Sequence, residues 1–346
     1  MARFNYGGQA LLEGVLMRGR DSIGVALRHP DGGIVSTQEK LDSALHRNRF
    51  ARAPFFRGLV VLYETLVVGT RWLMRSGSVQ AAGEGVELGR GAILLTMTMT
   101  IGFAVGLFVL LPLFLAQLTA RATVAGDPFI QHLYEGLIRV AIFVGYLLVV
   151  SQASDIKRVF RYHGAEHMTI HALEHEQPLT IENIRRHPTA HPRCGTEFLV
   201  VFVIVSIIVF SLLAGQDLVI SILGRILLIP VIASVSYEIL RFGAKYHRFR
   251  IIRWIYMPGI WLQMITTKQP DDSMIEVAVA SMREALAANG DPAPDGSLDP
   301  ERRPIETVVV GGAVAADAGR AEAVMHDGAG AGGATLPVGR AGPSES

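Results

Sequence analysis

The stretch 92–118 contains no charged residue, and this feature narrows the folds open to the chain more than any other. It exceeds the roughly 20 residues that a helix needs to cross the hydrocarbon core of a bilayer. The stretch 197–213 carries no charge after its first residue, whereas 133–151 and 218–237 are interrupted by charges. All four are expected to be helices, because a strand in lipid would leave its backbone polar groups unpaired.

The composition agrees with a membrane protein. Half of the 346 residues are hydrophobic, and the mean hydropathy of +0.35 is too high for an ordinary soluble enzyme. The net charge of +1 gives no support for a nucleic-acid partner. The single cysteine, Cys194, excludes an intrachain disulfide and fits a reducing compartment or a metal ligand. Residues 1–10 lack the apolar core of a cleavable signal peptide.

Arginine and lysine alternate along the flanks of the four apolar stretches. They gather before the first, between the second and third, and after the fourth, whereas the other two turns hold only Arg121. The positive-inside rule then predicts that both termini and the loop 152–196 lie in the cytoplasm. We therefore expect a multi-pass protein of the cytoplasmic (inner) membrane, with the lipid bilayer as its partner.

The expected fold is mainly α. It is a polytopic membrane helix bundle of about four transmembrane helices, with a small N-terminal β-hairpin and a cytoplasmic helical loop. The hairpin is predicted because the runs 22–28 and 33–37 flank the turn signal His-Pro-Asp-Gly. The chain divides into a β-rich cytoplasmic segment (1–50), an amphipathic or interfacial helix with a linker (51–90), the membrane bundle with its loop 152–196 (91–267), a short helix (268–286) and a disordered tail (287–346).

The motif His163-Gly164-Ala165-Glu166-His167 is the strongest indication of chemistry. In a helix, His163 and His167 lie one turn apart on the same face and can share one metal ion. Glu166 can then serve as the general base that activates water. The pattern H-x-x-E-H is also the signature of the inverted zinc proteases.

Other residues can complete the shell of such a metal. In a helix over 154–176, Glu174 lies near the face of the motif, with His171 less well aligned. His191 and Cys194 are three residues apart at a predicted bend, a spacing that can chelate. Arg193 and the start of the next helix are expected to lower the pKa of the Cys194 thiol.

Glu238 ends the fourth apolar stretch on the predicted cytoplasmic side. It is a candidate for the distant carboxylate that inverted zinc proteases use. A pair between Glu238 and Arg241 at the end of the helix is an equally favoured alternative.

Clustering favours metal binding over chance. Six of the eleven histidines lie between His163 and His191, and the only cysteine follows three residues later. Two simpler interpretations stay open. The segment can be a solvated histidine-rich loop in which Glu166 and Glu174 pair with arginines. It can also be a pH-responsive surface, because histidine titrates near neutrality.

For the charged residues outside the histidine cluster, a structural role is favoured over a functional one. The glycine-rich segment 6–19 lacks the lysine and the spacing of a P-loop, so Glu13 and Arg18 are expected to anchor it against the cytoplasmic loops or to line the site. Glu135, Arg139 and Arg225 lie within apolar stretches, where pairs that lock the bundle are favoured over a transport path.

Four stretches together resemble one family. They are GGQALLEGVLMRG (7–19), YHGAEHMTI (162–170), HPRCGT (191–196) and SYE (236–238). They are similar to bacterial YqhQ-like membrane proteins, a family labelled as domain of unknown function 1385 and as a predicted metal-dependent enzyme. The resemblance covers about 4–267 and implies a metal site at His163, His167 and Cys194. The usual pattern has lysine at the position of Met168, which leaves the candidate ligands intact.

The leading prediction is an integral membrane protein with a cytoplasm-facing site for a divalent transition metal, zinc being the first candidate. Glu166 is the expected general base of a metal-dependent hydrolase whose substrate lies at the cytoplasmic membrane face. A homo-oligomer is compatible with the sequence. The alternatives are a non-catalytic protein with a structural or regulatory metal site and, less favoured, a small transporter. The expected ligands are His163 and His167, completed from Cys194, His191, Glu174 or Glu238.

Overall fold

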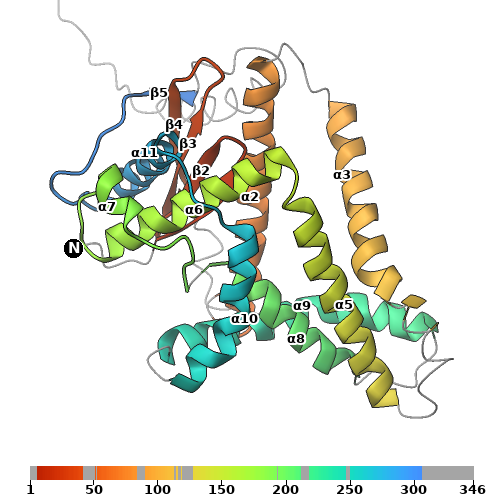
Figure 1. Cartoon of the computed structure of the whole chain (residues 1–346). Helices are drawn as coiled ribbons and strands as arrows, with labels where there is room; N and C mark the ends of the chain where they lie inside the picture. The colour runs from red at the N-terminus through yellow and green to blue at the C-terminus, as the bar shows by residue number, and fades with distance from the viewer. Residues whose placement is uncertain are drawn as a thin grey trace, which may run out of the picture. The chain divides into compact units, whose positions relative to one another are not determined.

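The computed structural model describes residues 6–41, 51, 53–83, 90–112, 114–115, 118, 128–192, 194–211, 218–246 and 250–305 (Figure 1). These residues belong to one compact unit that ends at Ile305. The unit is mostly helical and also contains a five-stranded sheet.

The strands follow one another in chain order across the sheet. They are β1 (Gly7–Leu11), β2 (Gly14–Arg18), β3 (Ser22–Arg28), β4 (Ile34–Lys40) and β5 (Arg302–Pro304). Neighbours are antiparallel except β4 and β5, which are parallel. The predicted hairpin is present as β3–β4. The glycine-rich segment, which belongs to the predicted β-rich region 1–50 but lies outside the predicted hairpin, forms the hairpin β1–β2, and its turn holds Glu13 in the left-handed region at φ 54°.

Two helices pack on the sheet and enclose the core with it (Figure 1). The helix α11 (Asp272–Asn289) contacts β2, β3 and β4, and α6 (Ser154–Glu174) contacts β1, β2 and α11. The close approach of α11 requires Gly24, because a β-carbon there would lie 2.3 Å from the Ala285 nitrogen. The Asp271 carboxylate caps the start of α11 by accepting the Met274 N–H at 3.1 Å.

The remaining helices carry most of the apolar sequence. They are α2 (Phe56–Gly83), α3 (Arg90–Val105) with its π-helical continuation η1 (Gly106–Leu110), α5 (Pro128–Val150), α7 (Ile181–Arg185), α8 (Thr196–Ser211), α9 (Leu218–Tyr246) and α10 (Arg250–Thr266). The helix α8 packs against α5, α9 and α10, and α2 packs against α9 and the β1–β2 hairpin. Glu64 on α2 is buried and accepts a hydrogen bond from Arg18 on β2 at 2.6 Å.

The prediction of a bundle with four transmembrane helices is wrong. Among the described residues, only Leu223–Gly243 is by itself long and apolar enough to cross a bilayer. The helix α8 has 16 residues. At 1.5 Å per residue it measures about 24 Å, less than the roughly 30 Å of hydrocarbon. The apolar segment of α3 and η1, Leu94–Phe108, is also short. In α5, the segment Tyr134–Val150 is long and apolar enough only together with α6, from which it is bent by 100°.

The charges inside the apolar helices pair with one another. Glu135 on α5 accepts hydrogen bonds from both terminal nitrogens of Arg225 on α9, at 2.7 and 2.8 Å, and from Arg139 at 2.8 Å. Glu135 and Arg225 are both buried. This bridge therefore joins α5 to α9, which is the geometry of a pair that locks helices together.

Part of the segment predicted as a tail has regular structure. The helix α11 continues to Asn289 and ends at Gly290, which has φ 71°. After it, the Leu298 N–H donates to the Leu179 carbonyl at 3.1 Å, and Arg302 at the start of β5 donates to Glu284 of α11 at 2.7 Å. The rest of the predicted tail, 306–346, lies outside the described residues.

Candidate metal centre

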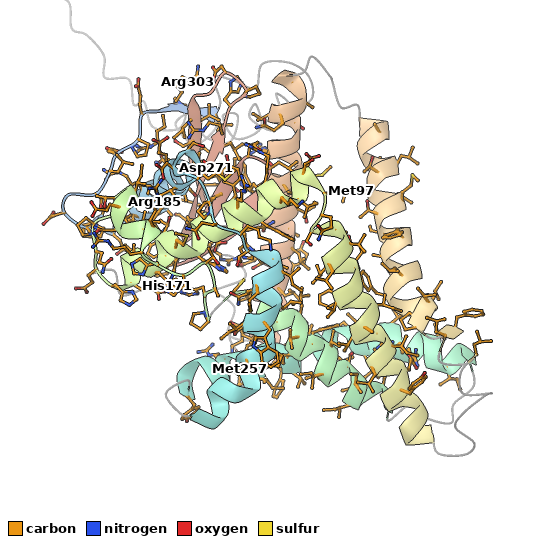
Figure 2. All side chains as sticks on the ribbon, in the orientation of Figure 1. Met97, His171, Arg185, Met257, Asp271 and Arg303 are labelled. Carbon is orange, nitrogen blue, oxygen red and sulfur yellow. The ribbon has the colours of Figure 1, made fainter. Side chains whose placement is uncertain are left out.

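The helix α6 places histidine at every fourth position. His163, His167 and His171 lie on α6, and His175 caps its end. Because four residues make about one turn, their side chains follow one side of the helix. Figure 2 labels His171 on this helix. The motif H-G-A-E-H is therefore helical, as predicted, and Glu166 and His167 within it are almost fully buried.

The segment before α8 brings a thiol to the first of these histidines. His163 Nε2 lies 3.3 Å from Cys194 Sγ, and the rings of His163 and His167 have centroids 4.4 Å apart. One ligand atom from each of the three side chains lies within 4.8 Å of the others. The structure thus brings together three of the predicted ligands from two segments of the chain.

Backbone carbonyls determine which ring nitrogen is available. His163 Nδ1 lies 2.9 Å from the Thr266 carbonyl oxygen, and His167 Nδ1 lies 2.6 Å from the Thr189 carbonyl oxygen. A carbonyl can only accept, so both Nδ1 atoms carry the hydrogen. In the neutral rings the lone pair is then on Nε2, the arrangement that metal-binding histidines use.

Burial keeps His167 neutral. Its exposed fraction is 1%, and removal from water, reinforced by the neighbouring His163, lowers the pKa of His167 to about 2. A neutral imidazole is the form that binds a metal.

Cys194 is a partly buried thiol. Burial raises the pKa of Cys194, although the Thr196 hydroxyl at 3.3 Å and the Thr196 N–H at 3.5 Å act in the opposite direction. The sequence predicted a lowered pKa because of Arg193, which lies outside the described residues, and the start of the next helix. Desolvation outweighs the helix start, so the thiolate needs a cation beside it.

Glu166 lies between this cluster and the sheet. Its carboxylate accepts a hydrogen bond from the Gly8 N–H of β1, and its Oε2 is 3.9 Å from His163 Nε2. Burial raises the pKa of Glu166 to about 8, and the thiol of Cys194 adds to the shift. His163 and the Gly8 N–H act against it. A buried carboxylate with a pKa near neutrality is typical of a general acid or base.

The donor set fits a zinc-like ion. Two imidazole nitrogens and one sulfur form a combination that zinc accepts, and tetrahedral zinc separates a nitrogen from a sulfur ligand by roughly 3.5 Å. The 3.3 Å between His163 Nε2 and Cys194 Sγ is close to that value. Both imidazoles also offer an Nε2 lone pair to the ion, because their Nδ1 atoms carry the hydrogen.

Two other predicted ligands form a group of their own. His191 Nε2 lies 3.4 Å from Glu174 Oε2, and the His191 ring has its centroid 4.5 Å from that of His171. One ligand atom from each of His171, Glu174 and His191 lies within 4.8 Å of the others. The predicted single shell is thus divided between two neighbouring groups along α6.

Glu238 lies in neither group. Its carboxylate accepts the Arg57 Nε–H at 2.8 Å and the Phe55 N–H at 3.1 Å, with a second bond from the Arg57 guanidinium. These contacts tie α9 to the start of α2.

Sequence reasoning missed the groups that orient the ligands. The carbonyls of Thr189, Ala190 and Thr266 and the N–H of Gly8 are backbone atoms, which no residue type announces. Only Thr196 gave a signal, since a hydroxyl two residues after a cysteine can donate to the sulfur.

Comparisons with known proteins identify the family of the chain. Residues 53–288 match the family described as "Protein of unknown function (DUF1385)". The chain is 33% identical over 294 residues to the uncharacterized protein YqhQ of Bacillus subtilis (strain 168), an alignment that covers 81% of this chain and 92% of that protein. No solved structure matches the chain. The chain therefore belongs to the DUF1385 family of YqhQ-like proteins.

Proposed function

We propose that the protein is a metal-dependent hydrolase, with zinc as its first candidate metal. One observation carries the proposal: His163, His167 and Cys194 converge with their ligand atoms within 4.8 Å, next to the buried carboxylate of Glu166. Three protein ligands are the number that catalytic zinc sites use.

Each side chain has a defined task in this proposal. His163 Nε2, His167 Nε2 and Cys194 Sγ would hold the ion. Bound there, zinc supplies Lewis acidity, which polarises the bond to be hydrolysed. The carbonyls of Thr189 and Thr266 keep both imidazoles in the tautomer that binds.

Glu166 would move the proton. Its raised pKa, about 8, makes its carboxylate a stronger base than an exposed glutamate. It would take a proton from water and deliver it to the leaving group. The Gly8 N–H keeps the carboxylate in one orientation during both transfers.

The lipid bilayer is the proposed partner. Large apolar side chains on α3 and α9 are exposed, among them Leu95 at 62%, Phe103 at 59% and Leu227 at 78%. Such surfaces are unusual on soluble monomers. The candidate span Leu223–Gly243 is followed by basic residues up to Arg253, which favours a cytoplasmic location for this end. The substrate would then lie at the cytoplasmic face of the membrane.

A structural or regulatory metal site is the second candidate. It is favoured by the contact between His163 and Thr266, because an ion on His163 and Cys194 would clip α6, α8 and the end of α10 together. Structural zinc sites stabilise folds in this way.

Metal analysis tests the centre itself. Protein purified without chelator is expected to carry at least one equivalent of transition metal, and His167→Ala is expected to carry one equivalent less than wild type. His29→Ala is the matched control, since His29 lies in the β3–β4 turn. Wild-type protein without stoichiometric metal would contradict the proposal.

Glu166→Gln separates the two candidates. The amide keeps the shape of the side chain and removes its basicity. A hydrolase should retain its metal and lose turnover of ester, amide or phosphodiester reporters presented in lipid vesicles. Unchanged metal content together with unchanged turnover would favour the structural site.

A further inference from the structure

We propose a second divalent-metal site formed by His171, Glu174 and His191. It goes beyond the proposed hydrolase, because it uses none of the residues His163, Glu166, His167 and Cys194. One ligand atom from each of its three side chains lies within 4.8 Å of the others. The two sites lie side by side, since the His191 and His167 rings have centroids 5.7 Å apart.

The helix positions two of the three donors. His171 and Glu174 are three residues apart on α6, so their side chains lie on the same face. His171 Nε2 lies 2.9 Å from the Ala190 carbonyl oxygen, so this nitrogen carries the hydrogen. The Nδ1 lone pair of the neutral ring is left for an ion, and the carbonyl fixes the orientation of the ring.

The third donor is held in place by its own backbone. The His191 N–H donates to the Gln263 Oε1 at 2.8 Å, and the Gln263 amide donates back to the His191 carbonyl at 3.0 Å. His191 is 3% exposed, and its Nε2 lies 3.4 Å from Glu174 Oε2. A rigid histidine beside a carboxylate is the arrangement expected of a preorganised site.

The two sites differ in chemistry and in access. The second offers two imidazoles and a carboxylate, a set that zinc accepts and that also suits harder ions such as manganese. The first contains the softer sulfur of Cys194. The Glu174 side chain is 30% exposed, so an ion there can be loaded from solvent, whereas His167 is buried.

A neighbouring histidine group competes for the same ion. His171, His175 and His187 also bring ligand atoms within 4.8 Å. The two groups share His171, which has one lone pair to give, so they cannot both be filled. We favour the group with Glu174 because its carboxylate neutralises part of the charge of the ion and His191 is fixed.

Cobalt(II) titration of the full-length, chelator-stripped protein in detergent tests this proposal. Two equivalents are expected to bind. One gives the thiolate-to-cobalt charge-transfer band of a cysteine ligand, and the other gives ligand-field bands alone. Glu174→Gln should remove the second equivalent, or weaken it at least tenfold, and leave the thiolate band. Glu176→Gln is the matched control, because it removes the same charge two residues away.

The outcomes are separable. The second site would be overturned if Glu174→Gln still bound two equivalents of cobalt with wild-type affinity. It would also be overturned if the wild-type protein bound only one equivalent and that ion gave the thiolate band. Loss of the second ion in His187→Ala with retention in Glu174→Gln would also overturn it, by placing the ion in the competing group. A Glu174-dependent equivalent without a thiolate band would support the second site and count against the proposed hydrolase centre.

Discussion

Gly8 leaves no room for a side chain beside Glu166, because a β-carbon on Gly8 would lie 3.0 Å from the Glu166 Cγ and Cδ. The same residue donates its N–H to the Glu166 carboxylate. A strand at the N-terminal end of the sheet therefore forms one wall of the metal centre on α6.

Gly8→Ala is expected to destabilise the protein by about 1–3 kcal/mol, because the new β-carbon would lie 2.5 Å from the Leu16 carbonyl oxygen and the hairpin must shift. Thermal melting measures the loss. Gly7→Ala is the control: nothing lies within 4 Å of its β-carbon, so its effect should stay within about 0.5 kcal/mol. Equal melting temperatures for the two variants would contradict the close contact.

Gly164→Ala is expected to lower stability although alanine favours a helix by about 1 kcal/mol. The β-carbon would lie 2.1 Å from the Lys268 carbonyl oxygen and push that segment away from α6. Gly77→Ala on α2 is the control, because its β-carbon meets only a Leu12 methyl at 3.4 Å, and it should melt no lower than wild type. Urea unfolding of both variants measures the difference. A higher stability of Gly164→Ala than of wild type would contradict the close contact, because the segment at Lys268 would then move away from α6 without cost.

Thr196→Val is expected to raise the pKa of the Cys194 thiol further, because it removes the hydroxyl that donates to the sulfur at 3.3 Å. Cys194 is the only cysteine of the chain, so the pH dependence of alkylation by iodoacetamide reports on it directly. Metal affinity should fall by about tenfold. Thr189→Val, which changes a hydroxyl bonded to Thr267 instead, should leave the alkylation profile unchanged. Identical alkylation profiles for all three proteins would show that the Thr196 hydroxyl does not affect the pKa of the Cys194 thiol.

Asp271 is expected to make stability depend on acid pH. Burial pushes its pKa upward, but hydrogen bonds from the Ser273 hydroxyl and the Met274 N–H outweigh burial and lower the pKa. The ionised form therefore stabilises the fold. That contribution is present above the unfolded pKa of about 3.9 and is lost as the pH falls through the lower folded value.

Two substitutions separate the charge of Asp271 from its role as a cap. Asp271→Ala should lose about 1 kcal/mol at neutral pH, whereas Asp271→Asn keeps the cap and loses less. Denaturant unfolding from pH 7 to pH 2.5 should show the wild-type advantage over Asp271→Asn shrink as the pH falls. A constant difference across this range would exclude the charge as its cause.

Local patterns predicted the parts of the fold that depend on local physics. The turn signal at 29–32 located the β3–β4 hairpin, and the four-residue spacing placed His163 and His167 on one helix face. The apolar runs were found as helices. Their prediction as four transmembrane helices was wrong. An apolar run indicates only that its side chains are removed from water, whereas the helix lengths and the 100° bend after Val150 are set by tertiary structure.

For the candidate site too, local patterns predicted one part and tertiary structure determines the rest. The clustering of histidines and the cysteine predicted that Cys194 and His163 belong to one site, and the two lie together. The separation of His191 and Glu174 into a second group depends on where the loop crosses α6. Glu238 matched the expected residue type at the expected helix end. Its contact with Arg57 depends on the packing of α9 against α2, which the sequence did not specify.

The parallel pairing of β5 with β4 has a consequence for synthesis of the protein. The sheet begins with Gly7, yet its last strand ends at Pro304 and leaves the ribosome only after every described helix. Until then the outer edge of β4 has unpaired backbone groups, which in a nascent chain invite the wrong strand. A chain arrested before residue 302 should therefore be more prone to aggregation than one released a few residues later.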